Sequence, residues 1–198
     1  MIENLAKPTS EIKTSANEIN RKSGELSGNR VDSDKRIGKT ENNTDYSYDG
    51  LGLTDKFIIG RAWGLPKSVL DTMYNFQELK HYHELNLAPM KFGETADGKD
   101  RFVLVPKDLE MKQPVDVQGR TNQERAEQGL SLKKDGKILE VHHIGQVEGG
   151  HYALLTKEEH TQNGYDKMLH NPNKAGVDHG IPFEADKRTI LKAVAEGV

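Results

Sequence analysis

The sequence predicts an α+β fold, with a small mixed domain toward the C-terminus and a disordered polar tether at the N-terminal end. Residues 1–44 carry scattered apolar side chains without the period of a helix or a strand. Short apolar runs between turn residues follow from residue 101 onward, which is typical of strands. Six of the eight histidines lie after residue 141, close to these runs.

The 198-residue chain has 34% hydrophobic and 30% charged residues, a polar composition that predicts segments outside any packed core. Residues 1–44 are rich in Ser, Asn, Lys and Glu, and we expect a flexible tether with at most a transient helix at 12–19. Residues 45–118 are predicted as an N-terminal helical and extended part. Within it, residues 46–100 either extend the C-terminal domain or form a separate small module. The histidine-rich domain is assigned to residues 119–198.

Composition and charge disfavour several classes of protein. The chain has no cysteine, which removes disulfides and thiolate metal sites. It has no apolar run long enough to cross a bilayer, and its first residues do not form a signal peptide. The net charge is -3, and residues 101–198 hold 14 Lys and Arg against 15 Asp and Glu. Binding to nucleic acid would therefore depend on a local basic patch or a bound metal.

The first elements expected are a helix and a strand. Residues 68–85 carry apolar side chains at roughly helical spacing, which predicts one helix. His81 and His83 lie two residues apart in it and face different sides, so we expect surface or core-edge positions. The Ala-Pro pair at 88–89 closes this segment, and residues 101–106 have the composition of a strand.

Two capping boxes mark the starts of further helices. The Thr-x-x-Glu pattern at Thr121 and Glu124 predicts a short helix that ends at Gly129. The same pattern at Thr156 and Glu159 predicts another helix, which begins shortly before the next histidine.

Two strands are predicted between these helices, at residues 137–141 and 152–155. An Asp-Gly turn at 135–136 precedes the first strand, and a Glu-Gly-Gly loop at 148–150 separates the two. The resulting order of strand, loop, strand and helix is a ββ-helix unit. A strand end and a helix can hold one metal ion between them in such a unit.

His142 and His143 come at the end of the first of these strands. Imidazole suits zinc and other borderline metals, and catalytic zinc sites use about three protein ligands. Because adjacent strand residues point to opposite faces, the two histidines cannot both bind one ion from a regular strand. We therefore expect one of them to bind a metal and the other to take a proton from water.

His160 and His170 can both join this metal site only if the chain bends between them. In a continuous helix, His160 and His170 would be separated by about 15 Å, too far for one ion. Both can bind the same metal only if the chain turns between them, and Gly164 is the expected position of that turn. Asn163 and Asp166 are the alternative oxygen ligands.

Other polar residues have open roles. His151 either contacts substrate or is a solvated loop residue, and His179 is expected in a turn. Arg120 either contacts phosphate or acts as a structural hydrogen-bond donor. The candidate phosphate-contacting group is Arg120, Arg125, Lys133, Lys134 and Lys137.

The motifs of residues 119–198 resemble those of a known family. They include Gly119-Arg120-Thr121-Asn122, Val141-His142-His143-Ile144-Gly145-Gln146, Leu154-Leu155-Thr156-Lys157-Glu158-Glu159-His160 and Leu169-His170. Their order and spacing are similar to those of the LHH group of the HNH/endonuclease VII superfamily. Val141 stands where that group has its leucine, an apolar exchange, and Tyr165 stands where asparagine is common.

This resemblance implies a ββα-metal, HNH-like finger embedded in the mixed domain and the hydrolysis of phosphodiester bonds. It implies that His142, His160 and His170 bind one divalent metal ion, zinc in first place, with magnesium, manganese or nickel as alternatives. It also implies that His143 is the general base. The candidate substrate contacts are Arg120, Gln146 and His151.

Members of this group are commonly the C-terminal nuclease domains of bacterial toxins. The resemblance therefore implies an endonuclease that acts on DNA as the toxin of a secreted antibacterial effector. Its expected place of action is the cytoplasm of a target cell, and its expected protein partner is an immunity protein. An RNase on the same fold is one alternative. A non-catalytic, metal-stabilised module that binds nucleic acid or a protein is the other.

Overall fold

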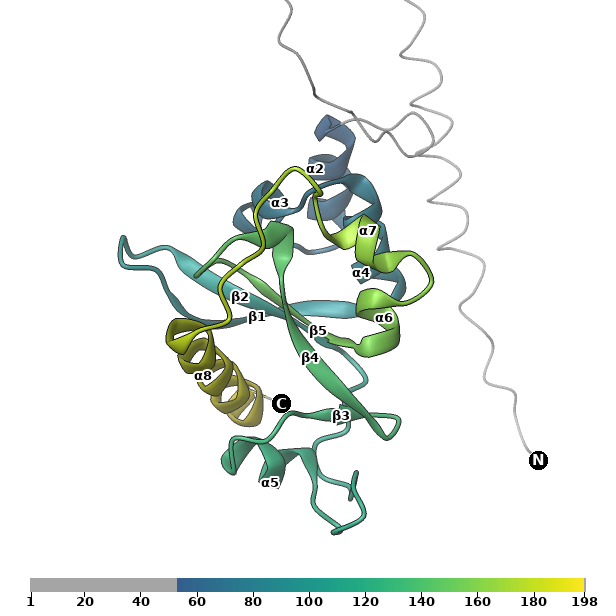
Figure 1. Ribbon diagram of the computed structural model, residues 1–198, viewed down its shortest axis with the longest axis vertical. Helices are drawn as coiled ribbons and strands as arrows, with labels where there is room; N and C mark the ends of the chain where they lie inside the picture. The colour runs from purple at the N-terminus through teal and green to yellow at the C-terminus, as the bar shows by residue number, and fades with distance from the viewer. Residues whose placement is uncertain (1–52, 198) are drawn as a thin grey trace, which may run out of the picture. The chain divides into compact units, whose positions relative to one another are not determined.

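The computed structural model describes residues 53–197, so the tether expected at 1–44, with its helix at 12–19, lies outside this range. The described chain is built on a five-stranded mixed sheet with strand order β1-β2-β5-β4-β3 (Figure 1). The strands are β1 (Leu87–Glu94), β2 (Asp100–Pro106), β3 (Lys133–Lys134), β4 (Lys137–His143) and β5 (Tyr152–Thr156). The helices are α2 (Leu53–Ala62), α3 (Lys67–Thr72), α4 (Phe76–Glu84), α5 (Asn122–Glu127), α6 (Lys157–Thr161), α7 (Tyr165–Leu169) and α8 (Ile181–Gly197), and a 3-10 turn, η2, covers Ile144–Gln146.

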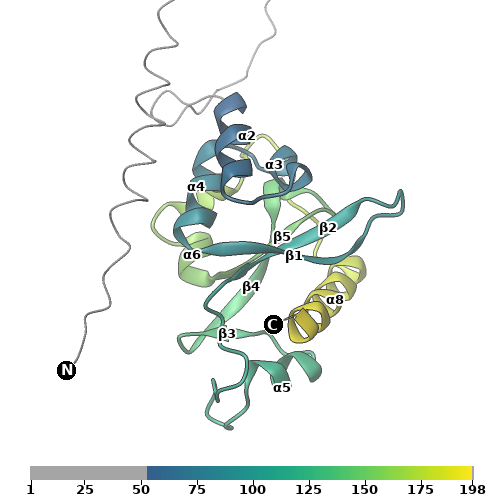
Figure 2. The same cartoon turned by 180° about the vertical axis from the view of Figure 1, so that it is seen from behind.

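β5 is the centre of the sheet. It pairs antiparallel with β4 and parallel with β2, and the register places His142 opposite Ala153 and His143 opposite Tyr152. All of its residues are buried, because helices cover both faces of the sheet (Figures 1 and 2). The apolar run at this position is therefore a strand buried on both sides.

The two faces of the sheet contribute to two separate cores. Successive residues of β5 point to opposite faces. Ala153 and Leu155 pack with α3, α4 and α7, whereas Tyr152 and Leu154 pack with α5 and α8. Figure 2 shows α2, α3 and α4 grouped together and α8 apart from them. By the same alternation, the two histidines at the end of β4 face different cores.

The elements predicted for the C-terminal half are confirmed. The strands expected at 137–141 and 152–155 are β4 and β5, and each is slightly longer than predicted. Both capping boxes are formed, with Thr121 and Thr156 each accepting a hydrogen bond from the backbone N–H of the glutamate three residues later. The strand expected at 101–106 is β2.

The single helix predicted at 68–85 is wrong. The structure has two helices there, α3 and α4, separated between Thr72 and Phe76. The side chain of Asn75 accepts a hydrogen bond from Glu78 N at 2.8 Å and so caps the start of α4. Lys56 Nζ donates to the carbonyl of Met73 at 2.9 Å, which occupies an oxygen that a continuous helix would use.

The segment does not end at residues 88–89, where its end was expected, because strand β1 runs through them. Pro89 lies inside this strand, which is an edge strand of the sheet, where proline is tolerated because one side of the strand needs no ladder bond. β1 and β2 together supply two strands of the common sheet. This favours an extension of the C-terminal domain, rather than a separate module, for the described part of residues 46–100. Within residues 53–197, no helix has the length and apolar content needed to cross a membrane.

His81 and His83 face different sides of α4, as predicted. His81 is buried, and its ring lies 4.2 Å from that of Tyr165. His83 is exposed and stacks on Trp63 at 3.7 Å. The tyrosine that departs from the family pattern thus packs against an imidazole of α4.

Candidate metal centre and active site

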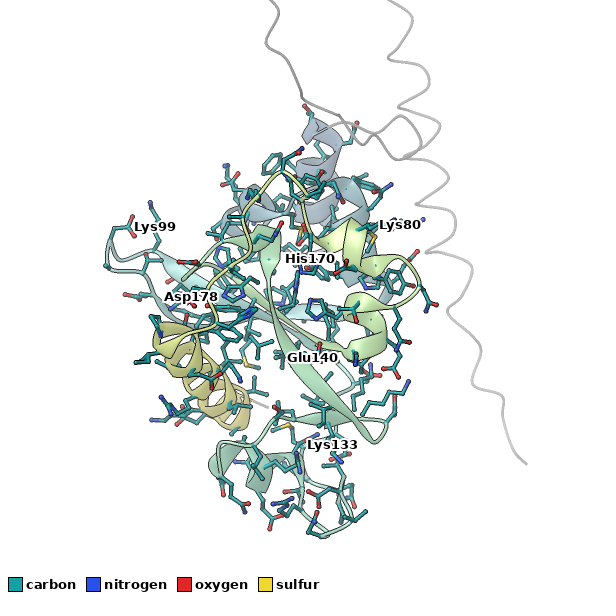
Figure 3. The ribbon with its side chains drawn as sticks, in the orientation of Figure 1. Lys80, Lys99, Lys133, Glu140, His170 and Asp178 are labelled. Carbon is teal, nitrogen blue, oxygen red and sulfur yellow. The ribbon has the colours of Figure 1, made fainter. Side chains whose placement is uncertain are left out.

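Three histidines from three elements meet beside β4. His142 lies near the end of β4, His160 lies in α6 and His170 directly follows α7. One ring nitrogen of each lies within 4.8 Å of those of the other two. Nδ1 of His142 is 3.0 Å from Nε2 of His160. Figure 3 shows His170 on the side of β4 where Glu140 also lies. The structure therefore brings together the three residues to which the resemblance assigns the metal.

The chain turns sharply between His160 and His170. α6 ends at Thr161, and Gly164 adopts a left-handed conformation with φ of 85° directly before α7. Asn163 also has a positive φ, of 56°. The two imidazole rings are consequently 5.3 Å apart, measured between centroids. The prediction of a bend at Gly164 is confirmed.

Oxygen atoms orient two of the three rings. Nδ1 of His160 lies 2.9 Å from Oε2 of Glu140, and Nδ1 of His170 lies 2.9 Å from the backbone oxygen of Asp166. An N–H at Nδ1 donates to each oxygen, which leaves Nε2 of each ring as the metal-binding atom. Proteins commonly fix metal-binding histidines in this way.

His142 has a buried nitrogen that the fold itself does not satisfy. Its Nε2 has no hydrogen-bond partner within residues 53–197, and an unpaired buried polar atom costs about 1–3 kcal/mol. Burial, followed by the neighbouring His160 and His170, lowers the pKa of His142 well below its usual value, so the ring is neutral. The ring nitrogens of three imidazoles, held within 4.8 Å of one another, fit a bound cation.

His143 lies on the other face of β4. Its side chain is 3% exposed, and its ring centroid lies 4.7 Å from those of both Tyr152 and Phe183. Burial, and then the nearby His179, lower the pKa of His143 to about 4. The imidazole is therefore neutral at physiological pH and can accept a proton.

An ion pair fixes the wall behind His143. The hydroxyl of Tyr152 donates to Oδ2 of Asp186 at 2.6 Å, and Arg101 pairs with the same carboxylate. The guanidinium carbon of Arg101 also lies 5.7 Å from the centroid of the Tyr152 ring. The ring against which His143 rests is thus held by residues of β2 and α8.

One edge of β4 is open, and this lets both of its faces reach the same pocket. β3 pairs with β4 only at Lys137 and Ile138, so within the described chain no strand covers the edge from Glu140 onward. A pocket of about 160 Å³ lies at this edge. Its lining includes His142, His143, Gln146, His160, His170 and His179. The metal-binding cluster and His143 open onto one space although they lie on opposite faces of the strand.

Two of the candidate substrate contacts have partners within the protein. Gln146 lines the pocket, and its side-chain oxygen accepts a hydrogen bond from Asn171 N at 2.6 Å. Arg120 is not part of the pocket lining and donates to Oδ2 of Asp116 at 2.8 Å. This contact supports the alternative role of Arg120 as a structural donor.

His151 is corrected to a structural residue. Its side chain is buried, so the solvated-loop alternative is wrong, and it does not line the pocket. Its Nδ1 accepts a hydrogen bond from Phe102 N at 3.1 Å, because β2 runs beside it. The ring thereby helps to hold β2 against the loop before β5.

The predicted basic group is largely engaged in ion pairs outside the pocket. Figure 3 shows Lys133 toward the α5 end of the sheet, away from His170. The pairs are Arg120 and Arg125 with Asp116, Lys134 with Asp108, and Lys137 with Glu158. These residues are therefore poorly placed to contact a phosphate at the histidines.

The turn η2 is held by residues that no motif indicates. Glu78 is fully buried, and its Oε1 accepts a hydrogen bond from Gly145 N at 3.2 Å. Lys174 Nζ donates to the carbonyl of Gly145 at 2.8 Å. A Cβ on Gly145 would lie 1.7 Å from the backbone oxygen of Thr72, so the turn packs tightly against the end of α3. The spacing of Asn75 and Glu78 is a helix-cap signal in the sequence, but it does not predict that Glu78 also binds the backbone of Gly145.

Comparison with known proteins identifies part of the chain. Residues 121–190 match the model of the LHH family, described as a nuclease of the HNH/ENDO VII superfamily with conserved LHH. The matched segment begins at the capping box of α5 and ends within α8, so it contains every histidine of the pocket. Neither the curated proteins nor the solved structures gave a match.

Proposed function

The chain carries in residues 121–190 a nuclease domain of the LHH group of the HNH/endonuclease VII superfamily, and we propose that it is a metal-dependent endonuclease that hydrolyses phosphodiester bonds in DNA. The shared pocket carries this proposal. His142, His160 and His170 line it together with His143. An ion-binding group and a neutral base that open onto one small space are what metal-assisted hydrolysis requires.

We assign one divalent ion to His142, His160 and His170. Three imidazoles favour zinc, with manganese or nickel as alternatives, and are less suited to magnesium, which prefers oxygen ligands. When bound, the ion supplies positive charge that stabilises the phosphate and the leaving oxygen. Three protein ligands leave a position open, as in catalytic sites, whereas structural zinc sites are usually closed by four. The ligand set therefore favours an enzyme over a non-catalytic metal-stabilised module.

His143 is assigned the proton transfer. Its neutral ring takes a proton from a water molecule while the water oxygen bonds to phosphorus, and the bond from phosphorus to the leaving oxygen breaks. Tyr152 and Phe183 hold the ring in one orientation. The pKa of about 4 keeps the ring unprotonated at neutral pH, and the negative charge of a bound phosphate would raise its basicity.

We further propose that the enzyme acts as the toxin of a secreted antibacterial effector. The resemblance of the motifs at 119–170 supports this role, and the polar composition of residues 1–44 suits a tether. The proposed place of action is the cytoplasm of a target cell, with an immunity protein as partner. Expression of the parent chain in bacteria should then arrest growth, and expression of His143→Ala should not.

Incubation of the purified full chain with plasmid DNA and with total RNA, each with and without a chelator, tests the proposed reaction. We expect the plasmid to be cut, the RNA to stay intact and the chelator to stop cleavage. Cleavage of RNA alone would favour the RNase alternative. Binding of metal without cleavage of either nucleic acid would favour the non-catalytic module.

Two variants test the roles of the histidines. His143→Ala should abolish cleavage but retain the metal, and loss of metal would reverse the assignment of the adjacent pair. His160→Ala should lower both metal content and thermal stability, because it removes a ligand. His83→Ala is the matched control, since this exposed ring stacks on Trp63 and is not part of the pocket lining.

A further inference from the structure

The loop between α7 and α8 lies across the turn that follows the histidine pair. Three hydrogen bonds of 2.6–2.9 Å tie this loop, residues 171–180, to residues 145–148. They run from Asn171 N to Gln146 Oε1, from Lys174 Nζ to the carbonyl of Gly145, and from Asp178 N to Glu148 Oε1. The loop is thus fixed at both of its ends and in its middle, and it forms one wall of the pocket.

His179 is carried near the end of this loop. Its side chain is exposed, and its ring centroid lies 5.5 Å from that of His143 and 4.8 Å from that of Phe183. The carboxylate of Asp178 accepts a hydrogen bond from Gly180 N at 2.9 Å, which fixes the backbone on either side of the imidazole. His179 therefore approaches the pocket from the α8 side, where His143 also lies.

The size of the pocket limits which part of a substrate its lining side chains can contact. At about 160 Å³, it is smaller than the roughly 300–1,000 Å³ of sites that enclose a whole small molecule. Its volume suits a phosphate group and a water molecule. Groups that line it are consequently placed to contact the phosphodiester itself.

We propose that His179 is a substrate-contacting residue of the nuclease centre, where its imidazole donates a hydrogen bond to a non-bridging oxygen of the phosphate held beside His143. The inference rests on the proposed function and names a contact that the family motifs at 119–170 do not include. Neutral imidazole keeps one N–H, so the donor is present whether or not the ring is protonated. Lys174 of the same loop already donates to the carbonyl of Gly145.

The exposure of His179 separates this role from folding. An exposed side chain contributes little to the core, so its removal should leave the structure and the three metal-binding histidines intact. His143, in contrast, is buried, and its replacement disturbs packing as well as chemistry. His179 is therefore the better position at which to measure a substrate contact alone.

The test compares His179→Ala, His179→Gln and the control His83→Ala in the zinc-loaded full chain, with plasmid DNA as substrate. Loss of a hydrogen bond to a charged oxygen should lower kcat/KM of His179→Ala about 10- to 100-fold. His179→Gln should recover part of this loss, because its amide can donate from a similar position. Zinc affinity and melting temperature should match the parent in all three variants, and His83→Ala should also keep the parental kcat/KM.

Three results would overturn the inference. A kcat/KM for His179→Ala within about threefold of the parent would show that no such contact is made. Loss of zinc from His179→Ala would make this residue part of the metal site instead. Failure of the parent chain to cut any nucleic acid would overturn the proposed function on which the inference rests, and that outcome is distinct because the parent alone reveals it.

Discussion

Replacement of Gly145 by alanine tests how the turn after the histidine pair is held. An ideal Cβ at this position would lie 1.7 Å from the backbone oxygen of Thr72, and Gly145 has a φ of +62°. Gly149 offers a matched control, because its φ is +63° and a Cβ there meets nothing within 4 Å. Both substitutions impose the same backbone cost, and only Gly145→Ala adds a collision.

The structure sets the size of the expected difference. A side chain in the left-handed region costs about 1–2 kcal/mol, and this applies to both variants. In Gly145→Ala the end of α3 must also move, which weakens the bonds from Gly145 N to Glu78 and from Lys174 to the Gly145 carbonyl. Each such bond is worth about 0.5–1.5 kcal/mol, and the collision itself adds strain. We therefore expect a loss of about 3–5 kcal/mol for Gly145→Ala and about 1–2 kcal/mol for Gly149→Ala.

Urea denaturation of the metal-free protein, followed by circular dichroism, measures both losses. A shift of the midpoint with an unchanged m value reports stability alone. In thermal scans, about 2–4 °C per kcal/mol gives a decrease of roughly 2–8 °C for Gly149→Ala and a larger one for Gly145→Ala. Equal losses for the two variants would refute the close packing of α3 against this turn.

Three further changes have distinct expected outcomes. Glu140→Gln removes the carboxylate that orients His160, and calorimetric titration should show metal affinity lowered about 10- to 100-fold, whereas Glu158→Gln, in an exposed ion pair, should match the parent. Burial raises the pKa of Glu78 to about 7 from 4.5, so its contribution to stability is present at acidic pH and declines as pH rises toward 7. In urea denaturation, the stability advantage of the parent over Glu78→Gln should shrink by up to about 3 kcal/mol between about pH 5 and pH 8. An advantage that stays constant over this pH range would contradict the expectation. Deletion of residues 1–44 should leave the cleavage rate unchanged, and a large loss would show that the segment is more than a tether.

Features that depend on a few neighbouring residues could be predicted from the sequence. The two capping boxes at Thr121 and Thr156 are formed because each is complete within four residues. The bend at Gly164 follows from helix geometry and glycine conformation alone. Asn75 and Glu78 have the same spacing as the two boxes. The sequence therefore contains a third helix-cap signal at the point where the helix expected at 68–85 is broken.

Features that depend on distant segments could not be predicted in this way. The parallel pairing of β2 with β5 joins segments that are about fifty residues apart, and no local pattern specifies it. The burial of His151 follows from that pairing, since its partner Phe102 N belongs to β2. His179 lies in a loop without a regular period, so its place in the pocket depends on the contacts that hold residues 171–180.

The histidine pocket depends on residues outside the segment that defines the family. Residues 121–190 supply all the imidazoles of the pocket, but Glu78 of α4 holds the backbone N–H of Gly145, and Arg101 of β2 pairs with Asp186 behind the ring that supports His143. A fragment limited to 121–190 would also leave β5 without its partner β2. Its central strand would then have an unpaired edge, and both cores would lose one of their walls. The family motifs therefore supply the chemistry of the site, whereas α3, α4 and β2 fix the turn and the strand that position it.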